Sequence, residues 1–293
     1  MSAEHPSIGF VGLGHMGGNM AARYLASGYQ VYGEARSREG LDQLFDEGLS
    51  WRDTPRDVAQ AADIVFTSIP NDDVLRDVAS GADGILAGLD EGSIWVDVST
   101  VSPRASREVA AQVRATGGQM LDAPVSGSVP QVKSGTLTIM VGGDEDAYRT
   151  VEPILRELGT PTRIGDNGHG LALKLAINIS LAAQILAFSE GLLLATRDGV
   201  DPELAAEVMT ASPIGSPMLK ARAPLVLDLP EEAWFDVRLM HKDIGLALEL
   251  AQELGLRLPS AGAADEELTE AETLGYGARD IASAYEVLAT IAE

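Results

Sequence analysis

The sequence predicts an α/β fold, with a doubly wound parallel sheet in its N-terminal part and an all-helical region after it. Up to about residue 165, short apolar runs alternate with helical stretches. These runs are apolar almost throughout, which is typical of parallel strands that helices cover on both faces. Beyond residue 165 the strand-like runs stop and long helical patterns follow. We therefore predict a sheet domain over residues 1–165 and a helical domain over residues 166–293.

The sheet domain opens with a strand, a glycine-rich turn and a helix. The strand and turn are SIGFVGLG (residues 7–14), and the helix is HMGGNMAARYLASG (residues 15–28). A later helix over residues 102–118 has Ser102 as its expected N-cap. Further strands are predicted from apolar segments at 29–35, 63–70, 93–99, 119–126 and 137–143.

The helical domain is predicted to begin with a helix far longer than the average one. The predicted helices cover residues 168–198, 201–211, 236–254, 262–273 and 280–292. In the first of them, an apolar run from Gly170 to Phe188 is interrupted by Lys174, Asn178, Ser180 and Gln184. These polar interruptions indicate the buried helix of a soluble protein rather than a membrane span.

Composition narrows the class of partner. The formal net charge is −23, which repels nucleic acids and anionic lipid surfaces, so neither is expected as a partner. The sequence contains no cysteine, which excludes disulfides and thiolate chemistry. The N-terminal segment shows no basic stretch followed by an apolar one, so we expect a cytoplasmic protein.

The glycine-rich turn has the spacing of a dinucleotide-binding loop. Gly12 permits a tight turn after the strand, Gly14 lets the backbone approach a pyrophosphate, and Gly17 allows the helix to pack closely on the strand. The helix N-terminus then faces the phosphates. A GxGxxG motif alone is weak evidence, but this one follows a strand and opens a helix. We therefore predict a Rossmann-type dinucleotide site.

The end of the second predicted strand bears on the choice between NAD and NADP. An acidic residue there usually binds the ribose hydroxyls of NAD. Glu34 is acidic, but counting from the glycines places Ala35 at the tip of the strand, followed by Arg36, Ser37 and Arg38. An arginine at this place suits the 2′-phosphate of NADP. The sequence favours NADP, and the alternative is that these arginines are ordinary surface charges.

One lysine stands in an apolar helical run. The chain has four lysines, Lys133, Lys174, Lys220 and Lys242, and Asn178 lies four residues after the second of them. Residues at i and i+4 project from the same helix face. A buried lysine is costly unless it is paired or used. The alternative is a lysine that reaches solvent and an asparagine that bonds to nearby backbone.

Several motifs in the same order resemble the β-hydroxyacid dehydrogenase family, also named after 3-hydroxyisobutyrate dehydrogenase, over about residues 7–285. The segments that carry the resemblance are FVGLGHMGGNMA (10–21), DVST (97–100), DAPVSGS (122–128), GHGLALKLAIN (168–178), FDVRLMHKD (235–243) and GYGARD (275–280). The resemblance implies hydride transfer between a nicotinamide cofactor and a small carboxylate-bearing substrate. It also implies a Rossmann domain, an all-helical second domain built on a long interdomain helix, and a homodimer or homotetramer.

The resemblance also implies roles for individual residues. Lys174 is implied as the catalytic acid and base, and Asn178 as the residue that orients the substrate. An unperturbed lysine titrates near pH ~10.4, so the base role requires burial to lower its pKa. The implied substrate-binding residues are Ser126, Gly127, Ser128, Phe235 and Asp243. The implied cofactor-binding residues are Gly12, Leu13, Gly14, His15, Met16, Gly17, Arg36, Ser37, Ile69, Pro70, Thr100 and Lys242.

Some alternatives remain open at this level. Lys242 can instead be a solvated helix charge, and His15 a solvated loop histidine. The four histidines, His5, His15, His169 and His241, have no metal-ligand spacing, so no metal site is predicted.

The substrate and the class of protein also have alternatives. The string SGS at residues 126–128 resembles the glyoxylate and succinic semialdehyde reductase branch, whereas GTLTIMVGG (135–143) resembles the hydroxyisobutyrate and tartronate semialdehyde branch. Two other classes are an imine reductase of the same fold and a non-catalytic NADP-binding module, and the lysine at position 174 argues against both. A 6-phosphogluconate dehydrogenase would need a longer C-terminal region.

Overall fold

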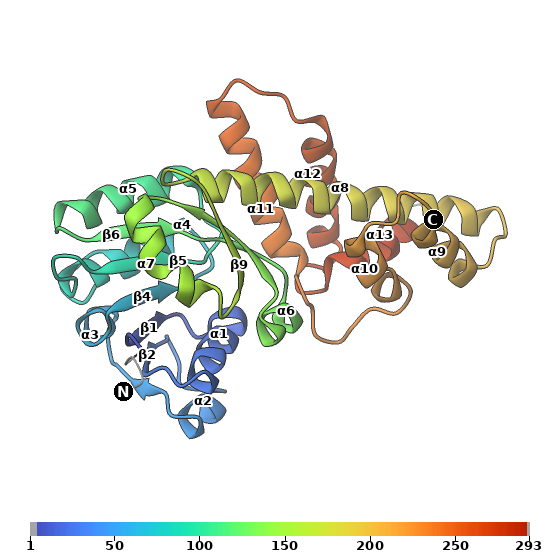
Figure 1. Cartoon of the computed structure of the whole chain (residues 1–293). Helices are drawn as coiled ribbons and strands as arrows, with labels where there is room; N and C mark the ends of the chain where they lie inside the picture. Colours follow the sequence, from blue (N-terminus) through green and yellow to red (C-terminus); the bar gives the residue numbers. More distant parts are fainter. Residues whose placement is uncertain (1–4, 292–293) are drawn as a thin grey trace. The chain divides into compact units, whose positions relative to one another are not determined.

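The computed structural model describes residues 5–291, which form two compact units. We call the part up to Lys174 the sheet unit and the part from Leu175 onward the helical unit. The division falls within one long helix, α8 (His169–Arg197), whereas the predicted boundary at residue 165 lies just before that helix. Figure 1 shows the order of the elements along the chain.

The sheet unit contains one nine-stranded sheet in the order β3-β2-β1-β4-β5-β6-β8-β7, with β9 paired to β8. The strands β1 to β6 pair in parallel, β8 runs antiparallel to β6 and β7, and β9 is parallel to β8. The predicted parallel α/β domain is therefore confirmed. The strand bounds are β1 (Ile8–Val11), β2 (Val31–Glu34), β3 (Ser50–Trp51), β4 (Ile64–Thr67), β5 (Ile94–Asp97), β6 (Gln119–Asp122), β7 (Val125–Ser126), β8 (Leu137–Gly142) and β9 (Gly159–Gly165).

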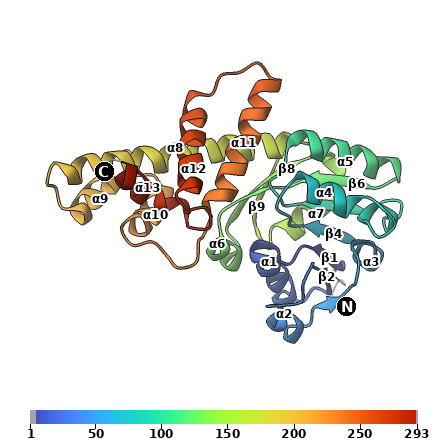
Figure 2. The same cartoon turned by 180° about the vertical axis from the view of Figure 1, so that it is seen from behind.

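Helices cover both faces of this sheet, and alternate strand residues contact them. In β5, Ile94 and Val96 belong to the core that includes residues of α1 and α7, whereas Trp95 belongs to the core that includes residues of α3, α4 and α5. Figures 1 and 2 show the two faces from opposite sides. The helices are α1 (His15–Ala26), α2 (Asp42–Asp46), α3 (Pro55–Ala61), α4 (Asp72–Ala79), η1 (Ile85–Ala87), α5 (Pro103–Ala115), α6 (Val129–Ser134) and α7 (Glu145–Leu155).

Several helices begin with a capping side chain followed by proline, which suits the first helical position. The hydroxyl of Ser102 accepts the N–H of Ala105, and Pro103 opens α5, so the predicted cap is confirmed. The same pattern begins α3, α9 and α10. Local sequence chemistry thus sets where these helices start.

The helical unit packs around α8. The residues of α8 that face this core are Ala182, Ile185, Phe188 and Leu192, and they pack with buried residues of α11 and α12. By length and composition alone α8 could cross a membrane, and 33% of its most apolar stretch is buried inside the structure. The remaining helices are α9 (Pro202–Ala211), α10 (Pro217–Leu227), α11 (Val237–Glu253), α12 (Pro259–Thr273), η2 (Ile281–Ser283) and α13 (Ala284–Ile291).

Candidate active site

The glycine turn lies between β1 and α1 and contacts the end of β4. Gly12 has a φ of 92°, and a Cβ there would overlap the carbonyl oxygen of Ser68. A Cβ at Gly17 would overlap the carbonyl oxygen of Gly12, so the close packing of turn and helix requires glycine at both positions. Leu13 is buried in the core beside the turn, and Met16 packs against the same core.

Gly14 differs from Gly12 and Gly17 because no atom beyond its own stretch of chain lies within 4 Å of the position of its Cβ. Gly14 is the N-cap of α1 and has no side chain to accept the first-turn N–H groups. Open space next to a helix N-terminus suits a phosphate group. His15, the first residue of α1, is exposed at the same place.

Beyond β2, the two predicted arginines have different surroundings. Arg38 lies 3.2 Å from Asp53 and its guanidinium stacks over Trp51, 4.5 Å from the ring centre. Arg36 is exposed. The hydroxyl of Ser37 accepts the N–H of Glu39. Glu34, the last residue of β2, is half-buried, and desolvation raises the pKa of its carboxyl group.

The carboxyl ends of β4, β5 and β6 lie side by side and carry buried polar residues. Thr67 donates to Asp97 Oδ1 at 2.7 Å and accepts the indole N–H of Trp95 at 2.9 Å. Ser99 also donates to Asp97 and accepts the N–H of Ile69 at 2.9 Å. Asp97 is fully buried, and desolvation raises its pKa, with a further rise from Asp122. This network fixes the loops that carry Ile69 and Thr100.

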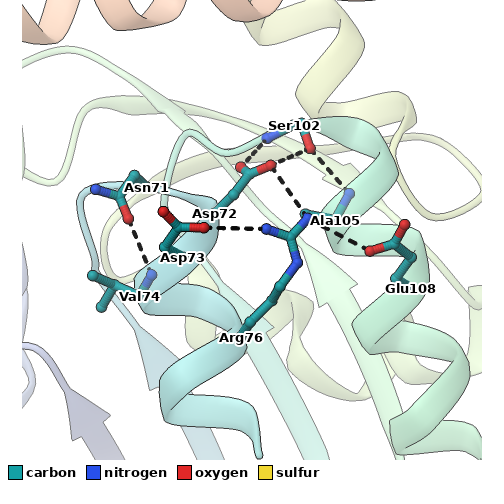
Figure 3. Close-up of polar contacts among 8 residues, drawn as sticks. All are labelled: Asn71, Asp72, Asp73, Val74, Arg76, Ser102, Ala105 and Glu108. Atoms are coloured by element: carbon teal, nitrogen blue, oxygen red, sulfur yellow. Dashed lines mark hydrogen bonds and ion pairs between the residues drawn. The ribbon is translucent and has the colours of Figure 1, made fainter.

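A second polar cluster joins the same two loops further out (Figure 3). Asp72, the first residue of α4, accepts the backbone N–H of Ser102 at 2.7 Å and its hydroxyl at 2.5 Å. Arg76 lies between Asp72, Asp73 and Glu108. Pro70 is two residues before Asp72, and Thr100 is two residues before Ser102. The contact between Asp72 and Ser102 therefore joins the two loops that carry Pro70 and Thr100, two of the predicted cofactor-binding residues.

The predicted substrate segment forms β7 and the start of α6. Ser126 ends β7, and Gly127 has a φ of 130°, where a side chain would be strained. The N–H and hydroxyl of Ser128 both donate to Gln131 Oε1, at 2.9 and 3.0 Å. The bond from the Ser128 N–H is one arm of the capping box that starts α6.

In the helical unit, three predicted site residues lie together. Asn178 is 1% exposed, and its amide donates to Asp243 Oδ2 at 2.5 Å. Lys242 Nζ lies 2.9 Å from the other carboxylate oxygen of Asp243. The N–H of Phe235 donates to Asp280 Oδ2 at 3.1 Å, which holds the segment before α11. Asn178 and Asp243 are thus fixed by each other, as a substrate-orienting pair would have to be.

Sequence reasoning assigned no role to several residues that shape these groups. They are Thr67, Asp72, Asp97, Ser99, Asp122 and Asp280, and most are buried carboxylates or hydroxyls at element ends. A polar residue directly after an apolar strand was the available signal. Among residues 5–291, no group of three or more His, Asp or Glu residues is arranged to hold a metal ion.

The residues of the sheet unit fit a dinucleotide cofactor. Glycines at 12 and 17 are required by close backbone contacts, whereas the space beside Gly14 is open. The α1 N-terminus lies at this space, and the loops after β4 and β5 are fixed beside each other. This is the arrangement that a pyrophosphate and a nicotinamide ring require at the carboxyl edge of a parallel sheet.

Comparison with known proteins agrees with this site. The model of the NAD binding domain of 6-phosphogluconate dehydrogenase matches residues 7–168. The model described as NAD-binding of NADP-dependent 3-hydroxyisobutyrate dehydrogenase matches residues 168–288.

Relatives with names match along most of the chain. Glyoxylate/succinic semialdehyde reductase 2 of Arabidopsis thaliana is 32% identical over 96% of this chain and 79% of its own length. 2-hydroxy-3-oxopropionate reductase of Escherichia coli is 35% identical over 88% of this chain and 89% of its own. The solved 3-hydroxyisobutyrate dehydrogenase of Mycobacterium tuberculosis, with L-serine, has a TM-score of 0.85 at 28% identity and covers 97% of this chain and 99% of its own.

A solved imine reductase from Myxococcus stipitatus in complex with NADP+ also matches, with a TM-score of 0.67. It is 20% identical over 97% of this chain and 99% of its own, so the likeness is one of fold alone. The Arabidopsis and Escherichia coli relatives above, both over 30% identical, are named as reductases. With the dinucleotide cradle and the buried Asn178–Asp243 pair, these matches show that the chain belongs to the β-hydroxyacid dehydrogenase family and is an NAD(P)-dependent oxidoreductase of small hydroxyacids.

Proposed function

We propose that this enzyme reduces a small aldehyde acid to its hydroxyacid, with Lys174 as the general acid, and that it runs the reverse reaction with Lys174 as the base. The proposal rests on Asn178, which lies one helical turn after Lys174 on α8. Asn178 is buried, and its amide is hydrogen-bonded to Asp243. Residues at i and i+4 of α8 present their side chains to the same side. The lysine ammonium and the asparagine amide therefore project from the same side of this helix.

The nicotinamide cofactor supplies or accepts the hydride when it is bound. As the carbonyl is reduced, negative charge develops on its oxygen. Lys174 Nζ donates a proton to that oxygen, and its positive charge stabilises the alkoxide before the proton moves. In the oxidation direction the neutral amine accepts the hydroxyl proton. Asn178 orients the reacting oxygen, since its own orientation is fixed by Asp243.

The substrate carboxylate is assigned to Ser126, Gly127 and Ser128. The positive φ of Gly127 turns the backbone between two serines that carry hydroxyl groups. Gln131 already accepts the N–H and hydroxyl of Ser128, so a carboxylate at Ser128 takes the place of this glutamine oxygen. From the helical unit we assign Phe235 and Asp243 to the substrate and Lys242 to the cofactor.

We further propose that NADP is preferred to NAD. Arg36 is exposed just beyond β2, whereas Arg38 is paired with Asp53 and stacked on Trp51. A planar guanidinium suits the 2′-phosphate.

Assembly and location complete the proposal. We assign a homodimer or homotetramer, because the helical unit exposes large apolar side chains such as Leu194, Leu204 and Val208. We assign the enzyme to the cytoplasm, because a chain without cysteine fits a reducing compartment. Its charge of −23 argues against nucleic acid or a membrane as a partner. We keep residues 1–165 and 166–293 as its proposed domains.

A substrate panel tests the proposed function. The purified protein is mixed with NADPH or NADH and with glyoxylate, succinic semialdehyde, tartronate semialdehyde or methylmalonate semialdehyde, and the loss of reduced-nicotinamide absorbance is followed. Turnover of one aldehyde acid, faster with NADPH, is expected and selects the substrate. Turnover of a cyclic imine with none of the four acids reduced would favour the imine reductase alternative.

A further inference from the structure

The start of α8 is capped from another strand rather than by its own neighbours. The residue before the helix is Gly168, which has a φ of 86° and no side chain that could act as a cap. The carboxylate of Asp122, the last residue of β6, serves instead. Its Oδ1 accepts the N–H of Gly168 at 2.6 Å, and its Oδ2 accepts the N–H of Leu171 at 3.0 Å. Both carboxylate oxygens thus accept N–H groups from the first turn of the helix.

Two glycines leave room for this carboxylate. A Cβ at Gly142, the β8 residue paired with Asp122, would stand 2.6 and 2.7 Å from its two oxygens. A Cβ at Gly170 would stand 2.9 Å from Oδ2 and would overlap the carbonyl oxygen of Met140. Asp122 itself has no exposed surface. The carboxylate is therefore enclosed between the end of the sheet and the helix, with little freedom to move.

The contact lies one turn below Lys174. Leu171 precedes the lysine by three residues, so its N–H lies about 4.5 Å further down the helix axis, at a rise of 1.5 Å per residue. Each residue turns the helix by about 100°. A shift of the helix start by one residue would therefore direct Lys174 to a different side. We propose that Asp122 is the positioning residue of Lys174, and that it sets the height and rotation of the lysine through the first turn of α8.

Burying the charged side chain of Asp122 costs free energy, which argues that its contact with the helix serves a function. Desolvation raises the pKa of Asp122, so its charged form is held in the interior at a penalty. The two N–H bonds and the positive end of the helix dipole offset that penalty. An apolar side chain would avoid it but would leave two buried N–H groups without partners. The inference rests on the proposed role of Lys174 as acid and base.

Asp122→Asn tests the inference, with Asp144→Asn as its matched control. An asparagine at 122 can accept only one of the two N–H groups and turns its own NH₂ toward the other. Asp144 caps α7 of the same unit, but its Oδ1 alone accepts both N–H groups, from Asp146 and Ala147. An asparagine at 144 therefore keeps both bonds. Replacing aspartate by asparagine is therefore expected to break a hydrogen bond at position 122 and none at position 144.

The readouts are turnover, cofactor affinity and hydrogen–deuterium exchange of the peptide that covers residues 166–175. In Asp122→Asn, kcat is expected to fall about 10- to 100-fold, since a displacement near 1 Å can cost that much. The KM for NADPH should stay within about twofold, because the glycine turn is untouched, and exchange at 168–174 should be faster. Asp144→Asn should match the wild type in all three. If Asp122→Asn does not fold, Asp122→Ser, which is smaller and keeps one acceptor, is measured in the same way.

The two claims fail in different ways. Wild-type kcat in the folded Asp122 variant, or a lower kcat with unchanged exchange, would overturn the positioning role. A rise in the KM for NADPH as large as the fall in kcat would also overturn it, because the substitution would then have altered the cofactor site as well. If the wild type reduces none of the aldehyde acids, the proposed function fails, and the exchange data still decide whether Asp122 holds the first turn.

Discussion

Asp280→Asn is expected to destabilise the helical unit strongly. Asp280 is fully buried and accepts four hydrogen bonds. Its Oδ1 accepts from Arg222 at 2.6 Å and from the N–H of Ala282 at 3.0 Å. Its Oδ2 accepts the N–H groups of Trp234 at 2.8 Å and Phe235 at 3.1 Å. An asparagine can serve one of these two pairs and must face the other with its NH₂ group.

The size of the loss in stability follows from the charge of Arg222, which the substitution leaves without a negative partner. Arg222 is also buried, and desolvation lowers its pKa, so it would lose the anion that compensates its charge. Breaking a buried ion pair from one side costs about 3–5 kcal/mol. At roughly 3 °C per kcal/mol for a domain of this size, the midpoint of thermal unfolding should fall by roughly 10 °C.

Urea unfolding followed by circular dichroism measures this change in the free energy of unfolding. Arg222→Met is the informative comparison, because it leaves Asp280 with three backbone N–H donors and should cost less than Asp280→Asn. Asp201→Asn is the control, since its Oδ1 caps α9 at the N–H of Leu204 and asparagine caps equally well. A cost below about 1 kcal/mol for Asp280→Asn, or a larger cost for Arg222→Met, would refute the reasoning.

Three further predictions concern the sheet unit. Arg36→Ala should raise the KM for NADPH by about 10- to 100-fold without changing that for NADH, whereas Arg38→Ala should have a smaller effect; equal changes with both cofactors would contradict the 2′-phosphate assignment. Gly14→Ala should weaken NADPH binding at an unchanged unfolding midpoint, whereas Gly12→Ala should lower both, as calorimetry and cofactor titration would show. Asp97 has a folded-state pKa raised from 3.8, so its neutral form stabilises the fold at low pH and this contribution is lost as pH rises through the raised pKa. Asp97→Asn keeps the Oδ1 bonds and should remove that part of the pH dependence in urea unfolding between acidic and neutral pH, and an unchanged profile would count against the raised pKa.

Much of the fold could be predicted because its signals are local. Apolar runs marked the strands β1, β4, β5 and β8, and the glycine spacing marked the β1–α1 turn. The long helix was predicted as 168–198 and is observed as His169–Arg197. The helix α10 lies outside the predicted helices, because Pro224 interrupts its pattern. Ser216 followed by Pro217 was the local signal of its start.

The contacts that fix the site could not be predicted, because they join residues far apart in the sequence. Asp122 bonds to N–H groups 46 and 49 residues away. Asp72 and Ser102 are 30 residues apart, and Asn178 and Asp243 are 65. The motifs named most of these segments through a family resemblance, but only the three-dimensional structure gives each carboxylate its donors.

Substitution of Lys174 is the most direct test of the proposed chemistry. Lys174→Met and Lys220→Met are compared with the wild type, since Lys220 is an exposed lysine on α10. We expect Lys174→Met to lower kcat for the best aldehyde acid by about 10²- to 10⁴-fold, with NADPH affinity and unfolding midpoint unchanged, and Lys220→Met to behave as the wild type. A Lys174→Met enzyme that keeps more than about a tenth of the wild-type kcat would contradict a general-acid role for this lysine.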